Sequence, residues 1–257
     1  MRHALRCLLL ASGLLCTALP AGATDRTGTH IASQLLREHV GGRPAAMSGA
    51  YTAVARGPLA LRYNPAGLAD ETNHTFLFQH SASVLEIKRN EVGWTLPLAS
   101  GGAGIALSYL DYGTMMRTTT VDKTGVGTFG AHDLLLRGGY GWRLSERLAV
   151  GGTLGLFQLA IDDADAVGLT ADVGATYRCP GLAGLLLGAS LRNLGPGARF
   201  DREREEFPLA LVLGAACRPV DAILLTADGE YLRNEDCQVR FGAEFTLRRG
   251  CEHVNAW

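Results

Sequence analysis

Residues 169–178 have the sequence Leu-Thr-Ala-Asp-Val-Gly-Ala-Thr-Tyr-Arg, in which apolar and polar or small residues alternate. The apolar face consists of Leu169, Ala171, Val173, Ala175 and Tyr177. The opposite face carries Asp172 and Arg178. A period of two residues indicates a β-strand, because successive side chains of a strand point to opposite sides. About ten residues is also the length that a tilted strand needs to cross a bilayer.

The same alternation recurs along the chain from residue 73 onward. It predicts about ten antiparallel strands. They cover residues 74–80, 86–98, 102–112, 128–143, 147–160, 167–178, 183–193, 207–217, 222–232 and 236–247. Longer polar loops fall at Met115–Gly127, Asp162–Ala166 and Gly195–Phe207. Such unequal loops are typical of barrels with short turns at one end and long loops at the other.

Two architectures have strands of this kind: a soluble β-sandwich with its apolar face inward, and a membrane barrel with that face outward. Aromatic residues distinguish them, because they fall near the ends of the apolar faces, as expected of girdles at the two membrane interfaces. These residues are Tyr109, Tyr140, Trp142, Tyr177 and Tyr231. We therefore predict an all-β protein, an antiparallel transmembrane β-barrel.

The N-terminus predicts export. Basic residues precede a nearly unbroken apolar run from Cys7 to Leu19, and small residues precede a cleavage site that we place after Ala23. We expect residues 1–23 to be a secretory signal peptide. A lipoprotein signal at Cys16 is the less favoured alternative, because Leu15 stands where a lipobox has a small residue. An exported barrel is expected in a bacterial outer membrane.

No catalytic or metal-binding pattern is found, so we expect neither an enzyme nor a cofactor or metal. The formal net charge of −1, with both signs scattered, gives no support to a nucleic-acid partner. Residues 125–130 match G-x-G-x-x-G, but no apolar strand precedes them, which indicates a loop. Asp162, Asp163 and Asp165 lack the glycine and the glutamate of a calcium-binding EF-hand loop.

The segment before the strands differs in character. Residues 41–55 have the sequence GGRPAAMSGAYTAVA and residues 62–69 have the sequence RYNPAGLA. Both are rich in small residues, and glycine interrupts them. Together they resemble the N-terminal signature of the PorV/PorQ family, part of the wider FadL-like group of outer-membrane barrels. The resemblance is strong over residues 41–69 and weaker over the barrel.

In FadL-like proteins the N-terminal segment folds into a hatch that occludes the lumen. The resemblance therefore implies a hatch, or plug, with a short helix over residues 24–70, and a transmembrane barrel over residues 71–257. The residues that carry the hatch signature are Gly42, Arg43, Met47, Gly49, Tyr51, Asn64, Pro65, Ala66 and Gly67. We expect residues 64–66 to form a turn, since proline biases the residue before it toward extended geometry and asparagine readily caps a turn. A role that only fixes the hatch shape is favoured over direct contact with a ligand.

Charged residues fall on the polar face of the predicted strands, where they would face the lumen. They are Asp133, Arg137, Asp172, Arg178, Arg192, Asp228, Glu230, Arg240 and Glu244. Buried charges need partners. We expect cross-strand ion pairs that support the barrel and hold the hatch, in preference to a solute-selective site, because a lumen of mixed sign pairs internally.

The resemblance also reveals a deficit. FadL-like barrels are similar to one another in having about fourteen strands, and the about ten predicted here could not close a barrel of that size and shear. Residues 248–257 do not alternate as a closing strand should. We expect the closing strands to be missing from this chain.

The resemblance implies passive transport of small hydrophobic molecules across the outer membrane, through a hatch-occluded lumen and without a cofactor. Outer-membrane lipid and a hydrophobic ligand would then be its partners. Resemblance to PorV implies instead an accessory or shuttle protein for secreted cargo, with components of type IX secretion as partners. A purely structural barrel is the third hypothesis. We favour transport.

Overall fold

The computed structural model describes residues 34–83, 86–118, 120, 122–180, 184–200, 203–233 and 237–246. The predicted signal peptide, residues 24–33 and the chain from residue 247 onward lie outside this range. Among the described residues, no helix is long and apolar enough to cross a membrane.

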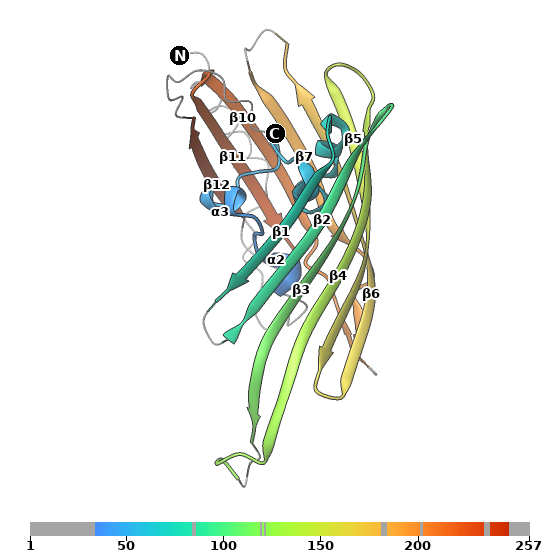
Figure 1. Cartoon of the computed structure of the whole chain (residues 1–257), viewed down its shortest axis with the longest axis vertical. Helices are drawn as coiled ribbons and strands as arrows, with labels where there is room; N and C mark the ends of the chain where they lie inside the picture. Colours follow the sequence, from blue (N-terminus) through green and yellow to red (C-terminus); the bar gives the residue numbers. More distant parts are fainter. Residues whose placement is uncertain are drawn as a thin grey trace.

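Within the described ranges, ten antiparallel strands form one curved, strongly tilted sheet (Figure 1). They are β1 (Thr75–Ala82), β2 (Lys88–Leu98), β3 (Gly101–Arg117), β4 (Gly127–Arg143), β5 (Leu148–Ile161), β6 (Ala164–Arg178), β7 (Leu186–Leu194), β10 (Ala210–Val220), β11 (Ile223–Leu232) and β12 (Gln238–Phe245). Each strand pairs with its neighbour in this order, so the sheet is a meander. A separate hairpin of β8 (Ala198–Phe200) and β9 (Glu203–Glu205) lies in the connection between β7 and β10.

The ten predicted strands are all present, but two loop predictions are wrong. Residues 162–166 form a tight hairpin, because β5 ends at Ile161 and β6 begins at Ala164. Asp162 adopts a φ of 57°, in the left-handed region that short hairpin turns use and that aspartate tolerates. Residues 127–130, which were expected in a glycine-rich loop, belong to β4. The long connection predicted at residues 195–207 is present between β7 and β10, and it contains the β8–β9 hairpin.

The apolar faces of the strands point outward. Leu154 of β5 is 74% exposed and Phe241 of β12 is 58% exposed, whereas Asp172 and Glu230 on the opposite faces are buried. Tyr140, Trp142 and Tyr177 are exposed near the strand ends, as the girdle prediction requires, whereas Tyr109 lies in the middle of β3 and is half-buried. Exposing such a surface to water would cost about 25 cal/mol per Å². A membrane barrel, and not a sandwich, has this arrangement.

The sheet remains open among the described residues. Its order runs from β1 at one edge to β12 at the other, and no pairing joins these two edges. The prediction that ten strands are too few to close a barrel of this kind agrees with this order.

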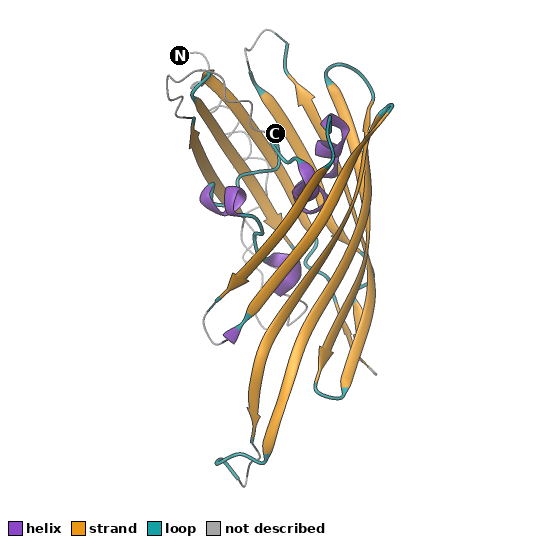
Figure 2. Ribbon diagram, viewed as in Figure 1, coloured by secondary structure: helices purple, strands orange, loops and turns teal. Residues whose placement is uncertain are grey.

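The N-terminal segment, residues 34–70, lies on the concave side of the sheet (Figure 2). It consists of short helical turns: α2 (Gln34–Arg37), α3 (Gly42–Ala46), η1 (Gly57–Leu59), α4 (Ala60–Tyr63) and η2 (Pro65–Asp70). Its buried side chains, among them Leu61 and Tyr63, share a hydrophobic core with Ala106, Ala216 and Leu224 of the sheet. The segment therefore fills part of the space that the sheet encloses.

Glycine recurs where this segment touches the sheet, and we call these positions the glycine belt. A Cβ atom at any of them would lie within 3.0 Å of an atom of the segment. The belt consists of Gly93, Gly102, Gly139, Gly141, Gly151, Gly174, Gly188 and Gly242. Seven strands thus share the contact, and larger residues on this face would prevent the segment from approaching.

Candidate functional site

The signature around Asn64 forms a compact turn. Asn64 is extended, with φ −164° and ψ 105°, and its side-chain Oδ1 accepts a hydrogen bond of 3.1 Å from the Ala66 N–H. Pro65 occupies the first position of η2, where its missing N–H costs nothing. Gly67 faces the Ala55 carbonyl so closely that no Cβ would fit. The geometry places these residues together as a capped turn inside the sheet.

The Asn64 side chain also joins this turn to the sheet. Its Nδ2 donates to the Thr52 carbonyl at 3.0 Å and to the Ala175 carbonyl of β6 at 3.1 Å. The residue is 0% exposed, and a Cβ at Gly174 would overlap its amide. Both N–H donors of the amide and its oxygen are used in hydrogen bonds that join the segment to itself and to β6, which supports a role in fixing the shape of the segment.

The middle of the segment is held by a carboxylate of β11. Asp228 Oδ2 accepts hydrogen bonds from the backbone N–H groups of Tyr51, at 3.0 Å, and Thr52, at 2.9 Å. The side chain is 2% exposed. A charged acceptor in a buried setting makes stronger hydrogen bonds than a neutral one.

A second attachment lies beside it on β12. Arg43 forms an ion pair of 2.7 Å with Glu244, and its guanidinium lies over the Tyr51 ring at 5.3 Å from the centroid. Tyr51 in turn packs edge-to-face against Tyr63, with the ring centroids 5.3 Å apart. Arg43 and Tyr51, two signature residues, therefore act together.

The remaining signature residues shape the backbone. Gly49 has a φ of 80°, and a Cβ there would lie 2.5 Å from the His39 ring. Met47 is buried and lies against Gly242, where an added Cβ would be 2.7 Å from that of Met47. Gly42 starts α3 in open space, and nothing in its surroundings requires glycine.

The end of the segment is fastened by Asp70. This carboxylate pairs with Arg56 of the segment at 3.2 Å, with Arg143 of β4 at 3.0 Å, and with Arg178 of β6. Arg178 was expected to face the lumen. Its side chain is half exposed at the strand end, and it binds the segment there.

The other predicted charges pair across the inner face. Asp172 receives Arg137 at 3.6 Å, the Thr153 hydroxyl at 2.8 Å and the Asn193 N–H at 2.6 Å. Asp133 accepts a hydrogen bond of 2.8 Å from the Tyr112 hydroxyl.

Glu230 has two cationic partners, which are Arg192 at 2.6 Å and Arg240. Every charge predicted to face the lumen therefore has a partner on the sheet or on the segment.

Several inward charges were not predicted from the sequence. Arg89 and Glu91 lie on the inner face of β2, and Arg89 pairs with Glu38 of the segment. The alternation within residues 86–98 could have shown them, since they share a phase with Thr95. Arg62 lies within the signature but is not among the predicted site residues, yet it is buried and donates to the Leu35 carbonyl at 2.8 Å.

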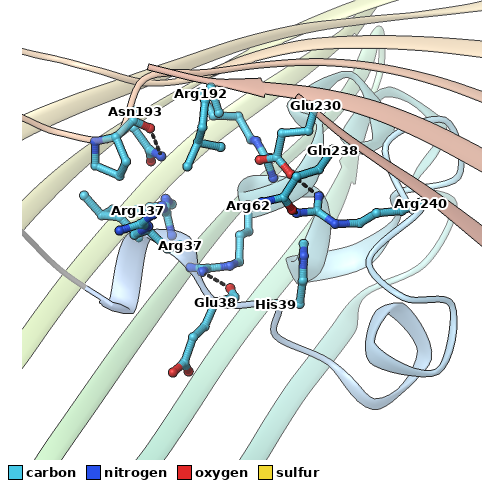
Figure 3. A pocket seen from close by; sticks show the side chains of 14 residues that line it. Arg37, Glu38, His39, Arg62, Arg137, Arg192, Asn193, Glu230, Gln238 and Arg240 are labelled. Atoms are coloured by element: carbon cyan, nitrogen blue, oxygen red, sulfur yellow. Dashed lines mark hydrogen bonds and ion pairs between the residues drawn. The ribbon is translucent and has the colours of Figure 1, made fainter. Parts of the chain in front are cut away.

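Two of the cavities that border the segment among the described residues differ sharply in polarity. The polar cavity, of about 270 Å³, is lined by charged side chains of the segment and of β4, β7, β11 and β12 (Figure 3). Figure 3 shows Arg240 reaching toward Glu230 at the edge of this cavity. The apolar cavity, of about 560 Å³, lies between α2 and the far ends of β3, β4 and β5. Its lining is Gln34, Arg37, Tyr112, Met115, Phe129, Ala131, Leu159 and Ile161.

Asp228 provides a first test of how the segment is attached. We expect Asp228→Ala to destabilise the segment, because it leaves two buried N–H groups without an acceptor, at about 1–3 kcal/mol each. Asp228→Asn keeps an acceptor oxygen and should be milder. Hydrogen exchange of the Tyr51 and Thr52 amides measures both. Equal protection in Asp228→Ala and the wild type would contradict the role of this carboxylate.

The outward apolar face, the meander of tilted strands and the segment on the concave side define a FadL-like outer-membrane β-barrel fold. Solved structures share this fold. The chain is similar to the crystal structure of the P. putida toluene transporter TodX, with a TM-score of 0.56 and 16% identity over 83% of this chain and 77% of that one. A TodX deltaS2S3 mutant, described as a monoaromatic hydrocarbon channel, gives a TM-score of 0.56 and 15% identity over 81% and 75% of the two chains.

A further crystal structure of the Pseudomonas putida toluene transporter TodX gives a TM-score of 0.52 and 17% identity over 75% of this chain and 70% of that one. Identities this low show a shared fold alone. No protein-family profile and no curated protein matches the sequence. The narrower resemblance to the PorV/PorQ family stays a prediction.

Proposed function

We propose that the protein carries small hydrophobic molecules passively across the bacterial outer membrane, with the N-terminal segment as a hatch in their path. The apolar cavity is the observation that carries this proposal. Its volume of about 560 Å³ lies within the roughly 300–1,000 Å³ of small-molecule sites, and its walls are mainly aromatic and aliphatic. The similar solved structures include a toluene transporter and a hydrocarbon channel, which agrees with such a cargo.

The place of the cavity fits a capture site. Its wall residues Ala131, Leu159 and Ile161 lie on the inner face of β4 and β5, next to the core under α2. Transfer of an apolar solute from water into this space lowers the free energy, because its apolar surface is removed from water, so capture needs no input of energy. To travel further along the inside of the sheet it would have to pass or displace the segment, because residues 34–70 fill the next part of the concave side.

Filling the cavity tests the proposal. Ala131 lines the cavity and is buried, so Ala131→Trp should occupy the space that the solute needs. Uptake of labelled toluene by cells that produce this variant should fall toward that of cells without the protein. Leu136→Trp is the matched control, since Leu136 lies on the same strand and faces outward. A fold check by heat-modifiable gel mobility accompanies both variants.

Two results would contradict the proposal. One is wild-type uptake in a correctly folded Ala131→Trp variant. The other is a wild-type protein that raises no uptake and instead purifies with a stoichiometric protein partner, as the secretion-accessory hypothesis predicts. The wild type and Leu136→Trp should behave alike in either case.

A further inference from the structure

The polar cavity contains more cations than anions. Five arginines line it, two from the segment and three from the sheet, against the two carboxylates Glu38 and Glu230. Burial, together with the charge of Arg240, lowers the pKa of His39 to about 4, so this lining residue is uncharged at neutral pH. The walls therefore carry an excess of positive charge.

The carboxylates of the cavity are already shared. Glu38 pairs with Arg89 of β2, which lies outside the cavity lining. Glu230 serves both Arg192 and Arg240. Neither carboxylate forms an ion pair with Arg62 or Arg137.

Arg62 is the clearest case of an unmet donor. It is buried, and its Nη2 donates to the carbonyls of Leu35 and Glu38, but its Nη1 has no hydrogen-bond partner. Arg137 also lines the cavity, is buried, and has an Nε without a hydrogen-bond partner, although Asp172 lies 3.6 Å from that atom. Burial and the charge of Arg137 lower the pKa of Arg62 to about 10. Both guanidinium groups line the cavity, and each has one nitrogen that no hydrogen bond satisfies.

We infer that the polar cavity binds a small oxyanion, either free phosphate or sulfate or the acidic group of a larger solute. Guanidinium groups present paired donors that match the oxygens of such anions, and charge-assisted bonds of this type are the strong ones. A bound anion would also offset the mutual repulsion of the buried cations. A hydrocarbon would leave these donors unsolvated, so this site differs in chemistry from the apolar cavity, with which it shares Arg37, and it does not rest on the proposed function.

Calorimetry on the full chain in detergent tests the inference. Inorganic phosphate and sulfate are titrated at constant ionic strength against chloride, and saturable binding with a rise in unfolding temperature is expected. Benzoate and glycerol phosphate form the second arm. Tighter binding of either than of the free anions would identify the acidic group of a larger solute as the natural occupant.

Two variants locate the site. In Arg62→Gln and in Arg240→Gln the dissociation constant should rise about 10-fold to 100-fold, as expected for the loss of a charged hydrogen bond. Arg147→Gln removes an exposed arginine of a turn and should bind as the wild type does. Arg62 also donates hydrogen bonds to backbone carbonyls, so Arg62→Gln can impair folding. In that case the affinity of Arg240→Gln is the test of the site.

The inference is overturned if the folded wild type binds none of these anions more tightly than chloride. It is equally overturned if folded Arg240→Gln retains wild-type affinity. Toluene uptake should be unchanged in Arg240→Gln, so failure here and failure of the proposed transport are distinguishable.

Discussion

Replacing Gly151 with alanine is expected to detach the N-terminal segment from the sheet, whereas the same replacement at the next residue is expected to leave it in place. A Cβ at Gly151 would lie 2.5 Å from the Pro65 carbonyl oxygen and 2.6 Å from the Ala66 nitrogen. These are backbone atoms of a capped turn, so they cannot rotate away. Overpacking of this kind costs about 1–3 kcal/mol, and sometimes more.

Gly152 is the matched control on the same strand. A Cβ added at Gly152 would point away from the segment. The atom nearest to it would be the Asp172 carbonyl oxygen at 3.6 Å, which is an ordinary van der Waals contact. Limited proteolysis in detergent, followed by mass spectrometry of cuts within residues 34–70, measures the attachment. Gly151→Ala should be cut much faster than Gly152→Ala, while the strands stay resistant in both. Equal cutting rates would show that the turn at Pro65 can shift to accommodate the added Cβ without loss of stability.

The strands could be predicted because their signal is local. Alternation along residues 169–178 identifies a strand with an outward apolar face, and β6 (Ala164–Arg178) has that face exposed. The tight turn at Asp162 could not be predicted in the same way, because a positive φ at one residue does not change the alternation of apolar and polar residues. The β8–β9 hairpin is too short to show an alternating pattern.

The inward charges illustrate the limit for the candidate site. Strand phase places Asp228 inside, but its partners, the N–H groups of Tyr51 and Thr52, lie more than 170 residues earlier in the chain. The position of a residue in the alternating pattern predicts which side of the sheet it faces. Its hydrogen-bond partner depends on where the N-terminal segment lies, which the pattern does not show. The polar cavity was missed for the same reason, since Arg62 and Arg137 meet only after the segment enters the sheet.

Glycine content is another signal whose meaning depends on tertiary structure. The sequence contains 33 glycines, many on the polar face of the predicted strands. From the alternating pattern alone, these glycines are interpreted only as small residues that suit a crowded lumen. The glycine belt gives the physical reason, because positions such as Gly174 and Gly188 lie directly under segment atoms.

Asn64→Asp is expected to have the second large effect, although it replaces one nitrogen by one oxygen. The two N–H donors that reach the Thr52 and Ala175 carbonyls are lost, and a carboxylate oxygen then faces two carbonyl oxygens. The site is 0% exposed, so water cannot solvate the new charge. An uncompensated buried charge costs about 3–5 kcal/mol. Hydrogen exchange in residues 47–70 should therefore rise sharply at neutral pH.

The dependence of this effect on pH separates charge from shape. Once protonated, the introduced carboxyl group can donate one hydrogen bond again, so exchange in Asn64→Asp, corrected for its intrinsic pH dependence, should slow as the pH falls. Asn73→Asp, an exposed site just before β1, is the control and should show neither change. If residues 47–70 exchange as slowly in Asn64→Asp as in the wild type at neutral pH, the Asn64 amide is not what attaches the segment to β6. The backbone contacts over the glycine belt would then be sufficient to hold it.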